Sequence, residues 1–140
     1  KYYFRVYALI KEKNYWSDEY SLEVKIPSDY KVSMVNTTKN ITVGQTATFT
    51  WYVDGASTEI NQTSVYFGQA SVSGVLDNNM KPSNTKYTDM VKDFANGKYN
   101  VPLQFVGNVK IATPGSYFYR AHALINGKNY WSNEDVFEVK

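Results

Sequence analysis

Histidine occurs only once in this chain of 140 residues, as His122, and cysteine does not occur. Without a second histidine or a thiolate, a zinc site would have to be built from carboxylates, which is unusual in proteins. A duplicated segment, described below, carries Tyr7 at the position that corresponds to His122. We therefore expect no catalytic or metal-binding role for His122, and no cofactor.

Acidic side chains are the other groups that could support catalysis or cation binding. They occur as the pairs Asp18-Glu19 and Glu134-Asp135 and as scattered single residues. None forms the Asp-x-Asp-x-Asp-Gly pattern of a calcium loop, and no Gly-x-Ser-x-Gly nucleophile elbow is present. Paired carboxylates can cleave glycosidic bonds, but no surrounding motif supports that chemistry here. The sequence therefore predicts that the protein is not an enzyme.

The most specific feature of the sequence is an internal repeat. Residues 2–25 align without gaps with residues 117–140, so that Tyr15 matches Tyr130 at an offset of 115 residues. Fourteen of the 24 aligned pairs are identical. Self-similarity at a fixed period is the signature of tandem-repeat proteins. We expect one full repeat preceded by the end of the previous one, with a terminal hairpin at 1–25, a linker at 26–29 and a domain at 30–140.

The composition predicts that this repeat is all-β. The 13 Tyr, 7 Phe and 3 Trp make up 16% of the chain, and aromatic side chains pack well on a pleated surface. Residues 46–53 alternate between apolar and polar side chains, which predicts a strand that ends at the turn signal Asp54-Gly55. Residues 69–100 are rich in Ser, Asn, Gly and Lys, and a short helix at 87–94 or a packed irregular loop both remain open there.

The duplicated segment predicts a β-hairpin in both places. In the second copy, Asn126-Gly127 is a strong signal for a tight hairpin turn. Lys11-Glu12 replaces this pair in the first copy, so we expect a differently built turn there. Alternation in the second copy puts His122 on the face opposite the expected core. The predicted core residues are Phe49, Trp51, Tyr117, Tyr119, Trp131 and Phe137.

Two segments resemble the fibronectin type III family. Residues 113–123 read TPGSYFYRAHA, similar to the family's penultimate strand, and Phe49-Thr50-Trp51 is similar to its buried second-strand tryptophan. The resemblance covers most of residues 30–140, whereas the long stretch 70–100 fits a variant subfamily of microbial surface repeats better. The resemblance implies a Greek-key β-sandwich of about seven to eight strands that serves in spacing, adhesion or assembly and has no active site.

Charge and glycosylation signals indicate where such a protein would act. The net charge is only +2 and the basic residues are scattered, so we expect no nucleic-acid partner. The apolar stretches are far shorter than the roughly 20 residues of a membrane span, so we expect no membrane insertion in this segment. Three Asn-x-Thr triplets favour an extracellular or cell-surface glycoprotein, at Asn36, Asn40 and Asn61.

The repeat favours a structural function. We expect a non-catalytic repeat unit of an extracellular fibre, filament or surface stalk, whose partners are copies of itself or adjacent tandem repeats. The first hairpin would dock head to tail where its duplicate lies in another copy, either as a strand donated between chains or as tandem domains in one chain. The residues expected in this assembly hairpin are Tyr3, Arg5, Tyr7, Tyr15, Trp16, Leu22 and Val24.

A carbohydrate-binding or adhesion module is the alternative function. Its partner would be a glycan, and exposed, coplanar Tyr or Trp side chains on one sheet face would support it. A catalytic domain would instead require a concave pocket with convergent polar groups.

Overall fold

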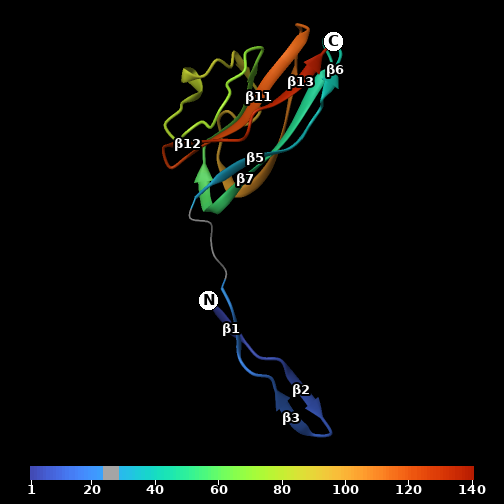
Figure 1. Ribbon diagram of the computed structural model, residues 1–140, viewed down its shortest axis with the longest axis vertical. Helices are drawn as coiled ribbons and strands as arrows, with labels where there is room; N and C mark the ends of the chain where they lie inside the picture. The colour runs from blue at the N-terminus through green and yellow to red at the C-terminus, as the bar shows by residue number, and fades with distance from the viewer. Residues whose placement is uncertain (24–28) are drawn as a thin grey trace.

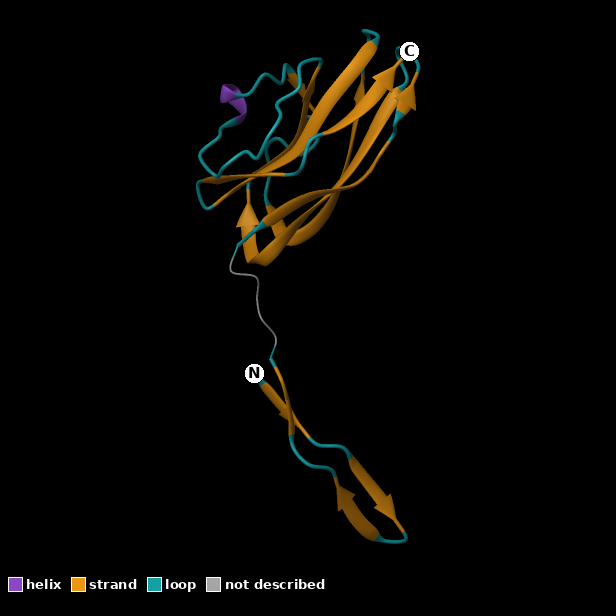
Figure 2. Cartoon of the chain, viewed as in Figure 1, coloured by secondary structure: helices purple, strands orange, loops and turns teal. Residues whose placement is uncertain are grey.

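The computed structural model describes residues 1–23 and 29–140, and within these ranges the chain is all-β (Figure 1). Its one helical element is a short 3-10 turn at Pro82–Asn84 (Figure 2). Val24 and the expected linker residues 26–28 lie outside the described residues. No helix in the described ranges is both long and apolar enough to cross a membrane.

The first described range forms one interrupted hairpin, which we name the N-terminal hairpin (residues 2–22). Its strands pair antiparallel, the first with the fourth and the second with the third. These strands are β1 (Tyr2–Phe4), β2 (Tyr7–Ile10), β3 (Lys13–Trp16) and β4 (Tyr20–Leu22).

The second described range forms a β-sandwich of two sheets. One sheet has the order β10-β7-β5, and the other has the order β6-β13-β11-β8-β9, with β12 also paired to β11. All pairings are antiparallel except β13 with β6. The strands are β5 (Lys31–Thr37), β6 (Asn40–Ile41), β7 (Thr46–Ile60), β8 (Gln62–Gly68), β9 (Asp89–Met90), β10 (Tyr99–Lys110), β11 (Gly115–Ile125), β12 (Lys128–Trp131) and β13 (Asp135–Val139).

The core lies between the two sheets and is dominated by aromatic rings. Phe49 on β7 contacts Tyr119 and Phe137 of the opposite sheet edge-on, with ring centroids 5.3 and 5.5 Å apart. The indole Nε1 of Trp51 donates a 2.8 Å hydrogen bond to Thr63 Oγ1, so its polar atom is satisfied inside the core. Phe49, Trp51, Tyr117, Tyr119 and Phe137 are all buried in this layer.

Strand β7 does not end at Asp54-Gly55, and this expectation was wrong. β7 continues to Ile60 because β10 pairs with it on both sides of this point, at Val53 and at Thr58. Gly55 has a φ of 136° and lies against Tyr30, whose ring carbon would be 2.5 Å from any Cβ at this position. The glycine therefore bends a continuous strand around an aromatic ring.

The segment 69–100 forms an irregular loop around the short β9, with no α-helix. The amide of Val91 donates to the carbonyl of Val65 on β8, so this stretch pairs with the sheet edge. Val91 is fully buried, and Phe94 packs against the core. The apolar residues at 87–94 therefore make separate contacts with the sandwich and do not form one face of a helix.

The two hairpin turns have the same backbone conformation, contrary to expectation. Asn126 and Gly127 have φ values of 50° and 76°, and Lys11 and Glu12 have values of 48° and 64°. Two consecutive residues with positive φ characterise the type I′ turn of two-residue hairpin loops. The first copy keeps this turn although neither of its residues is Gly or Asn.

Candidate functional site

The N-terminal hairpin and its duplicate, the C-terminal hairpin (residues 117–137), have identical strand registers. Tyr2 pairs with Leu22 as Tyr117 pairs with Phe137. In the same way, Tyr7 pairs with Trp16 and His122 with Trp131. The internal sequence repeat is therefore also a repeat of backbone pairing.

Side-chain hydrogen bonds are repeated as well. The amides of Val6 and Ala121 each donate a 2.9 Å hydrogen bond to the serine hydroxyl opposite, Ser17 in one copy and Ser132 in the other. The hydroxyl of Tyr7 donates to Asn14 Oδ1 at 2.7 Å. His122 Nε2 makes the corresponding 2.9 Å contact with Asn129 Oδ1. Each hairpin thus forms the same local structure.

The hairpins differ in burial. Tyr117, Tyr119 and Ile125 are buried in the sandwich core, whereas every described residue of the N-terminal hairpin except Ser17 is exposed. The contrast is clearest for the first aligned tyrosine, which is 68% exposed as Tyr2 and 7% exposed as Tyr117. The N-terminal hairpin therefore exposes to solvent apolar side chains whose duplicates form part of the core.

The outer face of the C-terminal hairpin is covered by residues 71–87, which we name the docking loop. Arg120 donates from its NH2 nitrogen to the carbonyls of Val72 and Gly74 at 2.8 and 2.7 Å. Its Nε donates to the Tyr87 hydroxyl at 3.2 Å and lies 4.0 Å from Glu134. The guanidinium is only 5% exposed, so this loop converts an outer strand face into a second buried layer.

Glu134 completes this polar cluster. Its carboxylate accepts hydrogen bonds from the Ser71 hydroxyl, the Tyr87 hydroxyl and the Val72 amide. Burial opposes ionisation of Glu134, but these hydrogen bonds and the nearby Arg120 outweigh it, so the pKa lies below its usual value. Burial and the charge of Glu134 raise the pKa of Tyr87. The carboxylate is therefore held ionised as a structural acceptor.

Trp131 belongs to this outer layer and not to the core between the sheets, where we had expected it. Its side chain is half-buried, its indole Nε1 donates to the carbonyl of Met80 at 2.9 Å, and its ring lies 4.4 Å from that of His122. Strand alternation puts this position on the face opposite Tyr130, and the docking loop covers that face.

His122 lies on the outer face of β11 as expected, but it is 1% exposed beneath the docking loop. Burial lowers its pKa to about 4, although the hydrogen bond with Asn129 opposes this shift. Nδ1 has no hydrogen-bond partner among the described residues. No group of three or more acidic or histidine side chains in the described ranges is placed to hold a metal ion.

The residues predicted for the assembly hairpin are brought together on one exposed element. Tyr3 and Leu22 lie on its outer strands, and Tyr7, Tyr15 and Trp16 lie on its inner pair, all solvent-exposed. The Arg5 guanidinium lies 3.6 Å from the Glu19 carboxylate.

The three glycosylation candidates all have exposed asparagines in the sandwich. Asn36 lies near the end of β5, Asn40 lies in the edge strand β6, and Asn61 lies between β7 and β8. Thr63 of the third triplet is buried and donates to the carbonyl of His122.

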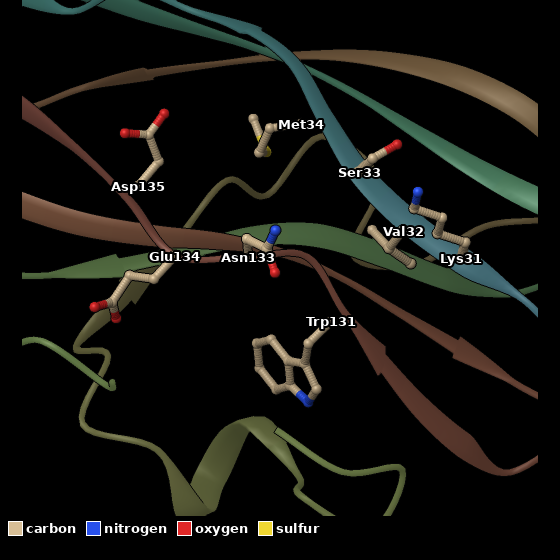
Figure 3. Close-up of a pocket in the computed structure, with 8 residues that line it drawn as sticks. All are labelled: Lys31, Val32, Ser33, Met34, Trp131, Asn133, Glu134 and Asp135. Atoms are coloured by element: carbon tan, nitrogen blue, oxygen red, sulfur yellow. The ribbon is translucent and has the colours of Figure 1, made fainter. Parts of the chain in front are cut away.

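A groove of about 370 Å³ opens between β5 and the segment 131–135 (Figure 3). Its two carboxylates are already occupied, because Glu134 contacts the docking loop and Asp135 contacts Lys39 and Tyr119. The pKa of Asp135 is also lowered, since burial is outweighed by the hydrogen bond from Lys39. Both carboxylates are thus held in their ionised form by neighbouring donors.

Exposed aromatic side chains are distributed unevenly between the two described ranges. Within residues 29–140, every Tyr, Trp and Phe side chain is buried or half-buried. The exposed aromatic residues of the described ranges all belong to the N-terminal hairpin.

No protein-family model matches this chain, and no curated protein matches it.

Proposed function

We propose that the protein is a non-catalytic structural repeat of an extracellular fibre, filament or stalk, in which each fibronectin type III-like sandwich is followed head to tail by the next. The observation that carries this proposal is the N-terminal hairpin, which has the register of a sandwich hairpin but an exposed core face. The strand orders β10-β7-β5 and β13-β11-β8 support a Greek-key arrangement of the family's type.

An isolated hairpin of this kind is incomplete. Two strands alone are marginally stable in water. Burying one large apolar side chain contributes about 1.5–3 kcal/mol, and the N-terminal hairpin exposes Tyr2, Phe4 and Ile10 at positions whose duplicates are buried. A second sheet against this face would supply most of the missing stability.

The resident sandwich does not offer this site to its own N-terminal hairpin. The position beside β8 that such a hairpin would take is already filled by the C-terminal hairpin, whose strand β11 pairs with residues 62–68. The covering sandwich is therefore a different one, either a preceding repeat in the same chain or a neighbouring chain.

The polarity of the sandwich supports a linear array. β5 starts where Lys31 pairs with Asp54, whereas β13 ends where Val139 pairs with Gly115 and Ile41. These points lie at opposite ends of the sandwich (Figure 1). Successive repeats joined through such ends extend along one direction.

The test is an extended chain in which residues 30–115 are placed directly ahead of Lys1, which creates one further full repeat. We expect amide hydrogen exchange of residues 2–22 to slow by at least about a hundredfold relative to the 140-residue chain, because isolated hairpins open freely. A matched extension carrying Phe49→Asp and Trp51→Asp in the added copy should give no protection. Fast exchange in both extended chains would contradict the proposal.

A further inference from the structure

Four side chains of the C-terminal hairpin hydrogen-bond to the docking loop. Arg120 and Glu134 contact residues 71–74 and Tyr87. Trp131 Nε1 donates to the carbonyl of Met80, and Asn129 Nδ2 donates to the carbonyl of Asn78 at 3.3 Å. The three donor side chains and the accepting carboxylate of Glu134 together hold the loop along most of its length.

All four side chains are retained in the N-terminal hairpin, as Arg5, Asn14, Trp16 and Glu19. Across the remaining 20 aligned pairs, only ten are identical. Even core positions differ, since Phe4 replaces Tyr119 and Leu22 replaces Phe137. Retention is thus complete among the side chains that hydrogen-bond to the loop and only partial elsewhere, where His122 beneath the loop is replaced by Tyr7.

These four residues are prepared for contacts that the described part of the chain does not supply. The Arg5–Glu19 pair is formed at 3.6 Å, but both side chains are about half exposed, at 51% and 52%. The corresponding pair Arg120–Glu134 is 5% and 14% exposed. Trp16 is 62% exposed and stacks beside Tyr7 with ring centroids 4.6 Å apart.

A solvated ion pair of this kind contributes little to the stability of an isolated hairpin. The retained arginine instead has the donors to bind a partner surface of backbone carbonyls and a phenol hydroxyl. Arg120 donates from NH2 to the carbonyls of Val72 and Gly74 and from Nε to the Tyr87 hydroxyl, and a lysine does not provide this planar set of donors.

A second polar cluster is not retained. In the sandwich, Lys39 contacts both Tyr119 and Asp135. The N-terminal hairpin carries Phe4 and Tyr20 at these positions, and their rings stack 5.9 Å apart. The N-terminal hairpin therefore keeps the groups that contact the docking loop, but it offers no carboxylate to a lysine at position 39 of its partner.

We infer that Arg5, Asn14, Trp16 and Glu19 are the recognition set for a docking loop of the preceding repeat, a segment with the chemistry of residues 71–87. This inference rests on the proposed function and names the part of the partner that the N-terminal hairpin recognises. The loop supplies carbonyl acceptors for Arg5, Asn14 and Trp16, and it supplies hydroxyl and amide donors for Glu19.

A double-mutant cycle in the extended chain tests this inference. Arg5→Ala is combined with Tyr87→Phe in the added repeat, and hydrogen-exchange protection of residues 2–22 is measured. We expect Arg5→Ala alone to lower this protection by at least about tenfold, the effect of losing one charge-assisted hydrogen bond. Because Arg5 and the added Tyr87 share one cluster, the two changes together should be non-additive by about threefold or more.

The matched control combines Arg5→Ala with Tyr87→Phe in the resident sandwich, and these two changes should be additive. Arg5→Lys keeps the charge without the fork and should lose protection nearly as far as Arg5→Ala. Additive effects in the added repeat, with the unmodified extended chain still protected, would overturn the recognition set and leave the repeat function standing. Absence of protection in the unmodified extended chain would overturn the repeat function itself.

Discussion

Position 122 is where the two hairpins differ in the side chain that can titrate near neutral pH. His122 is buried between β12 and the docking loop, and Tyr7 takes its place in the N-terminal copy. His122 contacts Asn129, and Tyr7 contacts Asn14, the aligned asparagine of the first copy. The sequence located His122 on the outer face but could not show its burial, because the loop that covers it has no local signal linking it to β11.

Stability of the sandwich should fall as the pH drops from 6.5 towards 4. The unfolded chain binds a proton on His122 in this range, whereas burial lowers the pKa of the folded state to about 4. The resulting loss is on the order of 3 kcal/mol, with full stability above pH 6.5. Urea unfolding at pH 7.5 and pH 4.5 measures it.

His122→Tyr is the control for this prediction, because the repeat itself uses tyrosine there. The carboxylates of Glu134 and Asp135, whose pKa values are also lowered, still contribute in this variant. The difference between the two pH profiles therefore isolates the histidine. Identical pH profiles would contradict the conclusion that the buried His122 causes the loss of stability at low pH.

At the scale of elements, the hairpin turns show how register can outweigh local preference. Lys11 and Glu12 both adopt positive φ, which costs about 1 kcal/mol for a residue with a Cβ. The strands on either side impose this turn because their pairing matches that of the C-terminal hairpin. Residue type at the turn therefore sets stability, while the strands set conformation.

Replacing Lys11→Asn and Glu12→Gly should stabilise the N-terminal hairpin in the extended chain by about 1–2 kcal/mol, because both new residues tolerate positive φ. Hydrogen exchange of residues 2–22 should slow by about five- to thirtyfold. The reverse pair, Asn126→Lys and Gly127→Glu, should destabilise the resident sandwich by a similar amount. Unchanged exchange in the first variant would show that the turn carries no strain.

The sequence predicted those elements whose signal is local. Alternation identified the hairpins and β7, and the core aromatic residues on β7 and β11 followed from it. The end of β7 was misplaced because Asp54-Gly55 is a turn signal that pairing with β10 overrides. Trp131 was misplaced because the docking loop, which creates a second buried layer, is held by contacts to residues about 50 positions away.

At the scale of the molecule, the chain combines one complete sandwich with a hairpin that matches the end of another. No disulfide can join them, because the sequence has no cysteine. We propose that hydrophobic burial, β-pairing and the docking-loop hydrogen bonds hold successive repeats in order. Asn36, Asn40 and Asn61 are exposed, so we expect glycans attached there to project outward from the proposed array.

Electron microscopy of natively purified material, together with its mass under denaturing conditions, tests the proposed repeat function most directly. We predict rods or filaments with an axial repeat of about 40 Å, because β11 has eleven residues at roughly 3.4 Å each and a short junction follows. A denatured mass of many repeats would identify tandem domains in one chain, and a mass of one repeat would identify strand donation. Dispersed, compact particles at every concentration would contradict the repeat function.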